Sequence, residues 1–151
     1  MNRKIALITG ASRGLGRSAA LHLAAQGIDI IGTYNSRADE AQNLVIELQA
    51  LGAKAAMLQL DVGHSEHFAA FAAQVAQVLE QTFERQRFDF LINNAGIGVH
   101  ALFSETTPEQ FEVVLRIIVE LAFDGVADFF AEVDEPAIEI LPALQVIAAQ
   151  R

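Results

Sequence analysis

The chain has 151 residues, of which 52% are hydrophobic and 19% charged, and these values predict one folded globular domain rather than a disordered chain. No apolar run reaches the roughly 18 to 20 uncharged residues of a membrane span, no secretion signal is recognisable, and the absence of cysteine excludes a disulfide framework. The net charge of −9 argues against nucleic acid and anionic membranes as partners, and a cytoplasmic location is expected.

Strand and helix patterns alternate through the first 92 residues. The strand patterns are short apolar runs, typical of a parallel sheet covered on both faces. The first two helix patterns end at Gly27 and Gly52, and glycine commonly stops a helix. Such alternation implies right-handed crossovers and a doubly wound parallel sheet. The predicted elements are a strand over Lys4–Thr9, a helix over Leu15–Gln26, a strand over Ile28–Tyr34, a helix over Ala38–Leu51, a strand over Lys54–Leu60, a helix over Ser65–Arg85 and a strand over Phe88–Ile92.

The last third of the chain differs in composition. Residues 1–104 contain nine acidic and eight basic residues, whereas residues 105–151 contain ten acidic and two basic. Thr107 and Pro108 predict the start of a helix that extends to about Val133, with charged residues at every fourth position and apolar residues between them. A helix with so narrow a polar stripe is buried in a core or packs against another chain. Ala137–Leu141 could form a fifth strand, and Pro142 could begin a last helix.

The segment Thr9-Gly10-Ala11-Ser12-Arg13-Gly14-Leu15-Gly16 lies between the first strand and the first helix. Glycines at this place allow a sharp turn, a close approach to a pyrophosphate, and packing of helix on strand, and we assign these roles to Gly10, Gly14 and Gly16 in that order. The free N–H groups and the positive dipole end of the helix favour an anion. The segment therefore predicts a dinucleotide-binding turn, and the alternative is an ordinary glycine-bearing turn.

This octapeptide resembles the TGxxxGxG cofactor motif of the short-chain dehydrogenase/reductase family. Asp61-Val62, after the third strand, resembles that family's adenine-contacting pair, and Asn93-Asn94-Ala95-Gly96, after the fourth strand, resembles its NNAG motif. The resemblance covers about residues 1–111. It implies a Rossmann-like three-layer α/β sandwich with strand order 3-2-1-4, extended by a fifth strand if Ala137–Leu141 joins the sheet.

The same resemblance implies roles for the NNAG residues. In the family, the segment matching Asn94-Ala95-Gly96 lies beside the ribose of a nicotinamide dinucleotide, and the residue matching Asn93 braces the sheet. The alternative for the two asparagines is that they are turn residues, since asparagine tolerates a left-handed backbone and bonds its own loop.

Charge near the expected adenosine ribose favours NADP over NAD. An NAD site usually offers a carboxylate about 20 residues after the glycines, whereas a 2′-phosphate needs cations. The second strand ends at Tyr34-Asn35-Ser36-Arg37, with no acid until Asp39. Arg13 and Arg37 could clamp the phosphate through charge-assisted hydrogen bonds, unless Arg37 is merely a solvated residue at a helix start. The expected cofactor contacts are Gly10, Ser12, Arg13, Gly14, Leu15, Gly16, Asn35, Ser36, Arg37, Asp61, Val62, Asn94, Ala95 and Gly96.

The catalytic residues of the family have no match in this sequence. The family uses a tyrosine as general acid, a lysine four residues later, a serine, and an asparagine on the helix after NNAG. The only tyrosine, Tyr34, lies in the second strand, and the only lysines, Lys4 and Lys54, lie at strand starts. No serine follows Ser104, and Ile118 falls where the asparagine would be. A tyrosine with a pKa near ~10 needs a nearby cation to donate a proton at neutral pH. We therefore expect nucleotide binding without hydride transfer.

Residues 112–151 also depart from the family, because an acidic, apolar tail replaces its second half. A natural truncation or rearrangement and a chain shortened by design both remain open as explanations. Three functions follow in order: a single-domain NADP(H)-binding relative without catalysis, an interaction protein that forms a homodimer through the helix over Pro108–Val133, and an active oxidoreductase with displaced catalytic groups. No metal site is expected, because His64 and His67 lack a convincing third ligand.

Overall fold

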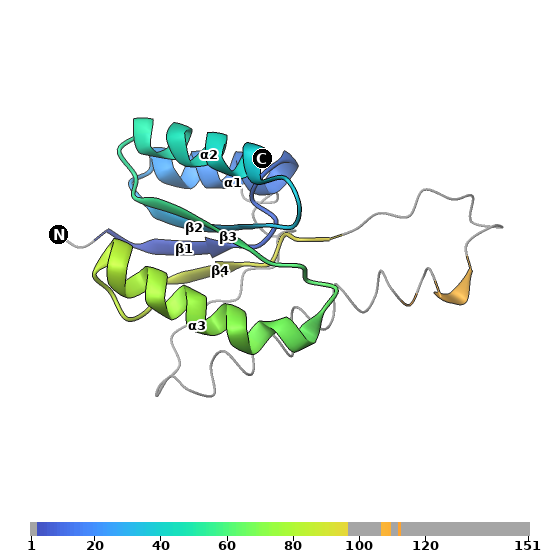
Figure 1. The fold of residues 1–151 in the computed structure, drawn as a ribbon. Helices are drawn as coiled ribbons and strands as arrows, with labels where there is room; N and C mark the ends of the chain where they lie inside the picture. Colours follow the sequence, from blue (N-terminus) through green and yellow to red (C-terminus); the bar gives the residue numbers. More distant parts are fainter. Residues whose placement is uncertain (1–2, 97–106, 110–111, 113–151) are drawn as a thin grey trace.

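The computed structural model describes residues 3–96, 107–109 and 112, and this part of the chain is built around one parallel sheet (Figure 1). The strand order is β3-β2-β1-β4, which confirms the predicted order. Each observed strand is one or two residues shorter than its apolar run. In the pairing register, Ala6 of β1 lies between Ile30 of β2 and Phe90 of β4. The strands are β1 (Ile5–Ile8), β2 (Asp29–Tyr34), β3 (Ala55–Gln59) and β4 (Phe90–Ile92).

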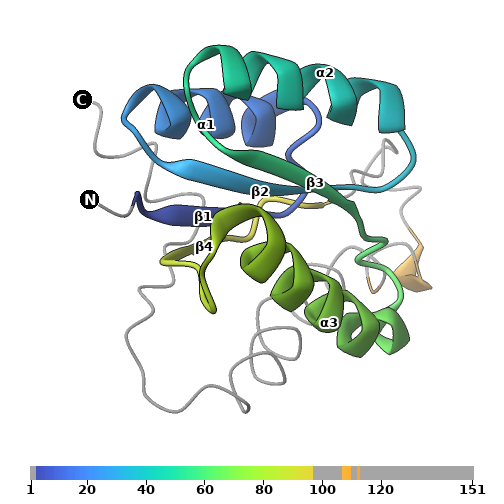
Figure 2. The same ribbon diagram turned by 60° about the vertical axis from the view of Figure 1, so that its left-hand side comes forward.

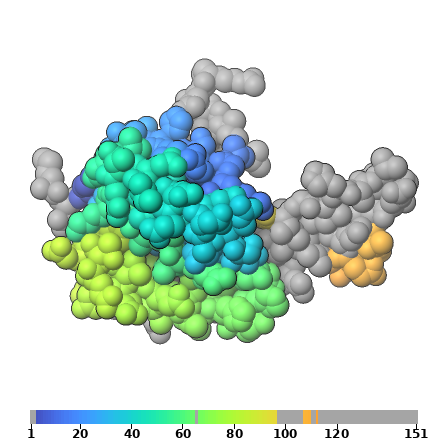
Figure 3. Space-filling view, turned by 45° about the horizontal axis from the view of Figure 1, so that its top comes forward, coloured from blue at the N-terminus to red at the C-terminus, as the bar shows by residue number. Residues whose placement is uncertain are grey.

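Helices cover both faces of the sheet. α1 (Gly14–Ala25) and α2 (Ala38–Ala50) lie on one face, and α3 (Phe68–Val78) lies on the other (Figure 2). Figure 3 shows α1 and α2 side by side on the surface, where Arg17 of α1 forms an ion pair with Glu47 of α2. The arrangement confirms the expected Rossmann-like three-layer sandwich.

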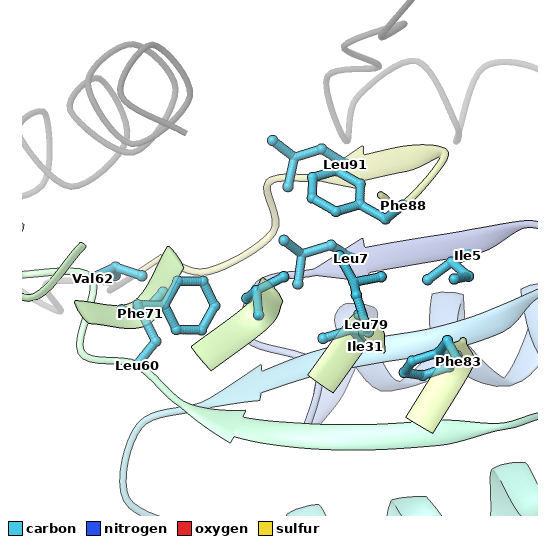
Figure 4. Packing of buried hydrophobic residues seen from close by; sticks show 11 residues of the cluster. Ile5, Leu7, Ile31, Leu60, Val62, Phe71, Leu79, Phe83, Phe88 and Leu91 are labelled. Carbon is cyan, nitrogen blue, oxygen red and sulfur yellow. The ribbon is translucent and has the colours of Figure 1, made fainter. Parts of the chain in front are cut away.

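The two layers of core arise from the alternation of side chains along the strands. On β1, Ile5 and Leu7 belong to the cluster under α3, while Ala6 and Ile8 belong to the cluster under α1 and α2. Successive side chains of a strand point to opposite faces, so one apolar run supplies both clusters. Figure 4 shows the α3-side cluster, in which strand residues such as Leu7 and Leu91 face helix residues such as Leu79.

The long helix predicted over Ser65–Arg85 is divided into three segments. A 3₁₀ turn (Ser65–His67) leads into α3, and a π-helical turn (Leu79–Phe83) follows it. The helix ends at Glu84, whose φ of 57° is left-handed, and the Arg85 N–H donates to the Leu79 carbonyl oxygen at 3.0 Å. The helix is present, but its regularity is lower than the sequence pattern predicted.

Two carboxylates tie together the amino ends of the strands, opposite the glycine turn. The Asp29 carboxylate accepts the Lys54 N–H at 2.9 Å and lies 3.5 Å from the Arg3 guanidinium. The Asp89 carboxylate accepts the Ile5 N–H at 2.8 Å. Both acids therefore bridge neighbouring strands and stabilise the register on which the opposite edge depends.

The predicted helix over Pro108–Val133, the strand over Ala137–Leu141 and the helix from Pro142 lie almost entirely outside the described residues. Pro108, Glu109 and Glu112 have helical backbone. Among the helices that the structure describes, none is long and apolar enough to cross a membrane.

Candidate functional site

The glycine segment forms a tight turn at the carboxyl end of β1. Gly10 and Gly14 have φ values of 64° and 58°, a left-handed backbone that glycine adopts without a steric penalty. The Gly10 N–H donates to the Thr33 hydroxyl oxygen at 3.0 Å, and the Ala11 N–H donates to the Thr33 carbonyl oxygen at 2.8 Å. The turn is therefore anchored to the end of β2.

A second anchor joins the turn to the segment after β4. The Thr9 hydroxyl oxygen accepts the backbone N–H groups of Asn94 and Ala95, each at 3.0 Å. The Asn94 side-chain amide donates to the carbonyl oxygens of Thr9 and Gly10, at 3.1 and 3.0 Å. These bracing hydrogen bonds come from the second asparagine of the pair, whereas the family resemblance assigns bracing to Asn93.

Gly16 is required by close packing, but its neighbours differ from those expected. A Cβ at this position would lie 2.4 Å from the Gly10 carbonyl oxygen and 2.5 Å from the Asn94 side-chain nitrogen. Gly16 thus lets α1 approach the turn and the segment after β4, whereas we predicted packing of the helix on a strand.

The entrance of α1 is open. A Cβ added at Gly14 would meet no atom within 4 Å, and the neighbouring Leu15 is 72% exposed. No side chain of the described residues caps the helix at Arg13, and its first turn contains no acidic residue. Arg13 is exposed, whereas Ser12 is buried. Within the described part of the chain, no acid of the first turn compensates the positive end of the helix dipole.

Arg37, expected to contact a 2′-phosphate, is held by two acids of its own helix start. Its guanidinium donates to the Asp39 carboxylate at 3.3 and 3.4 Å and lies 3.0 Å from the Glu40 carboxylate. The hydrogen bond from Arg37 lowers the pKa of Asp39, and that bond to Asp39 raises the pKa of Arg37. The neighbouring Asn35 and Ser36 are exposed.

The pair after β3 lies beside the end of β2. The Leu60 N–H donates to the Tyr34 carbonyl oxygen at 2.9 Å. The Asp61 carboxylate accepts the Gly63 N–H at 2.9 Å. Val62 is buried in the core on the α3 face, which leaves mainly its backbone to face a ligand.

The carboxyl edge of the sheet thus gathers all the expected contact segments, and hydrogen bonds join the glycine turn directly to β2 and to the segment after β4. Sequence reasoning missed Thr9 and Thr33 as the residues that hold the turn. Both are buried, at 3% and 1% exposure. The available signal was a hydroxyl side chain inside or just after an apolar strand, where a buried hydroxyl normally has a hydrogen-bond partner.

The two lysines of the chain lie away from the glycine turn. Lys4 and Lys54 precede β1 and β3, at the opposite edge of the sheet from the glycine turn. Lys54 forms an ion pair with Glu84 at 3.3 Å, and the Lys4 ammonium lies 5.0 Å from the centre of the Phe90 ring. Within residues 3–96, 107–109 and 112, no group of three or more His, Cys, Asp or Glu side chains could hold a metal ion.

Comparison with protein families gives one match that spans most of the chain. The model of the short chain dehydrogenase family matches residues 4–137. Tetrahydroxynaphthalene reductase PfmaG of Pestalotiopsis fici is 37% identical over 115 residues, which are 76% of this chain and 39% of that protein. A 3-oxoacyl-(acyl-carrier-protein) reductase of Synechocystis sp. is 33% identical over 118 residues, which are 78% of this chain and 45% of that protein. The chain spans less than half the length of these relatives.

Solved structures show the same similarity. Angucycline C-6 ketoreductase LanV with bound NADP superposes with a TM-score of 0.78 at 27% identity, over 85% of this chain and 50% of that one. A short chain dehydrogenase from Burkholderia cenocepacia in complex with NADP has a TM-score of 0.70 at 32% identity, over 85% of this chain and 49% of that one.

Proposed function

This chain belongs to the short-chain dehydrogenase/reductase family, and we propose that it binds NADP(H) at the carboxyl edge of its sheet. The observation that carries the proposal is the glycine turn, which presents two left-handed glycines and an uncapped helix start. Such a helix start supplies free N–H groups and a positive dipole end to a pyrophosphate. The NADP bound to similar proteins supports the assignment to a nicotinamide dinucleotide.

The preference for NADP(H) over NAD(H) rests on charge. Arg13 and Arg37 are exposed near the expected 2′-phosphate, and guanidinium groups bind phosphate through charge-assisted hydrogen bonds. NAD(H) is the less favoured ligand. The remaining expected contacts, including Asp61 and Asn94, are proposed to surround the adenosine and the nicotinamide ribose as their counterparts do in the family.

Binding is tested by titrating the protein with NADPH and NADH, followed by fluorescence or calorimetry. In Gly14→Asp, a carboxylate would enter open space at the helix start and repel the pyrophosphate, so we expect binding to be lost while the fold is retained. Gly52→Asp is the matched control, because Gly52 also has a left-handed φ and open space but terminates α2 at the other edge of the sheet. Equal binding by the two variants, or no binding by the folded parent at millimolar nucleotide, would contradict the proposal.

We also propose that these 151 residues do not transfer hydride by the family mechanism. The only tyrosine ends β2, and both lysines lie at the opposite edge of the sheet. A panel of aldehydes, ketones and quinones with NADPH should give no turnover. Reproducible turnover that disappears in Gly14→Asp would instead show an active oxidoreductase with displaced catalytic groups.

A homodimer through the helix predicted over Pro108–Val133 is the second candidate. It rests on the narrow polar stripe of that sequence, in which charged residues recur at every fourth position. Light scattering at high protein concentration tests it, and a monomer would count against it.

A further inference from the structure

The α2 start contains a compact group of charges: Arg37, Asp39 and Glu40. The Arg37 guanidinium contacts both carboxylates, at 3.3 Å for Asp39 and 3.0 Å for Glu40. The Arg37 side chain is 53% exposed, and its Nε and one terminal nitrogen already face these two acids. Without a ligand, the Arg37 guanidinium is therefore already paired with two carboxylates.

Glu40 depends on this contact more than Asp39 does. The Glu40 side chain is 29% exposed, compared with 68% for Asp39. Its second carboxylate oxygen is buried and has no hydrogen-bond partner among the described residues. Burying an oxygen of an ionised carboxylate costs free energy unless a cation lies nearby. Moving Arg37 away from Glu40 would therefore cost free energy.

A 2′-phosphate would bring about −1.5 to −2 charges to this place, whereas the 2′-hydroxyl of NAD(H) brings none. Asp39 and Glu40 already offset the charge of Arg37, one of the two arginines on which a phosphate would depend. A neutral hydroxyl does not need Arg37 to leave its partners.

We propose that Asp39 and Glu40 are positioning residues that compete with the 2′-phosphate for Arg37. This competition keeps the preference for NADP(H) over NAD(H) small. The inference rests on the proposed nucleotide binding and adds what sets its selectivity. The selectivity between NADP(H) and NAD(H) then depends on which groups Arg37 contacts, and not only on the presence of an arginine at this position.

The test measures the dissociation constants of NADPH and NADH for the parent, Asp39→Asn and Glu40→Gln. We expect each substitution to tighten NADPH binding about two- to fivefold, the range for release of one exposed ion pair, and to leave NADH binding unchanged. The ratio of the two dissociation constants is the informative quantity, because a general change in the fold would alter the binding of both nucleotides alike. Adenosine 2′,5′-bisphosphate compared with AMP isolates the contribution of the 2′-phosphate.

Two further variants separate a local contact from a change in net charge. Glu47→Gln removes the same charge from α2, but Glu47 pairs with Arg17 and lies about 15 Å along the helix from Arg37 at 1.5 Å per residue. It should leave the ratio unchanged. In an Arg37→Gln background, Asp39→Asn should no longer change the ratio, because the residue through which Asp39 acts is absent.

The inference is overturned if Asp39→Asn and Glu40→Gln leave the NADPH to NADH ratio unchanged or shift it toward NADH. An equal gain from Glu47→Gln, or a gain that persists without Arg37, would also overturn it, since either result indicates simple charge repulsion. Failure of the parent to bind any of the four nucleotides would instead remove the proposed function itself, and this inference with it.

Discussion

Thr9 and Thr33 connect three strand ends through their hydroxyl groups. Thr33 accepts the Gly10 N–H, and Thr9 accepts the N–H groups of Asn94 and Ala95. Because both threonine side chains are buried, removing a hydroxyl leaves its N–H donors without their acceptor. The conformation of the glycine turn therefore depends on side chains outside the turn itself.

Replacement of Thr9 tests this dependence. Thr9→Val keeps the shape of the side chain but leaves two N–H groups without their acceptor, and we expect a loss of about 1 to 3 kcal/mol in the free energy of unfolding. Urea denaturation measures it. Thr9→Ser retains the hydroxyl and should lose clearly less, so an equal loss in both variants would count against the hydrogen bonds as the cause.

Arg37 shows how the contacts of a side chain can differ from those that the sequence suggests. The sequence indicates a cation near the ribose and no acid until Asp39, two positions later. In the structure, the helix start turns that acid and Glu40 back onto the guanidinium. The distance along the chain did not reveal the contact, because the φ and ψ angles at the helix start decide which side chains meet.

The segment from Ser65 to Glu84 illustrates the same limit at the scale of an element. Apolar periodicity predicted one helix, and the helix is present, but a 3₁₀ turn begins it and a π turn ends it. The pattern reports which face is buried, as Phe71, Val75 and Leu79 confirm. It does not report the hydrogen-bond spacing, which adjusts so that Phe83 also enters the core.

Glu84 ends this element in a left-handed conformation that glycine would adopt at less cost. Glu84→Gly should therefore raise the free energy of unfolding by up to about 1 kcal/mol, as the relief of strain exceeds the added entropy of the unfolded chain. Thermal denaturation checks the sign. Glu84→Gln, which removes the exposed ion pair with Lys54 but keeps the backbone strain, should have the stability of the parent.

At the scale of the whole molecule, the sheet is a partition between two cores. Ile30 and Ile31 are consecutive residues of β2, both fully buried, and they belong to opposite clusters. A strand buried on both faces tolerates a polar residue only where its polar atoms are hydrogen-bonded, as they are in Asp29 and Thr33 towards the two ends of β2. The polar residues of function are consequently restricted to the strand ends and the loops that follow them.

Shortening either isoleucine tests whether both faces are packed alike. Ile30→Val and Ile31→Val should each lower the free energy of unfolding by about 0.5 to 1.5 kcal/mol, with one cooperative transition in urea. An Ile31→Val variant as stable as the parent would show that the α3 face is loosely packed. If only Ile31→Val lost stability, the face under α1 and α2 would be the loosely packed one.

The sequence by itself determined the alternation of strands and helices and the glycine turn, because these depend on local patterns: apolar runs, helix periodicity, and glycines where the backbone must turn sharply. Its motifs also identified the family, and that resemblance supplied the strand order. Only the tertiary structure decided which groups hold that turn and which carboxylates pair with Arg37. Thr9, Thr33 and Asn94 are separated by 24 and 61 positions in the chain, and they meet because parallel strands bring their carboxyl ends to one edge. Contacts between residues far apart in sequence are set by strand register and backbone angles, which no short motif encodes.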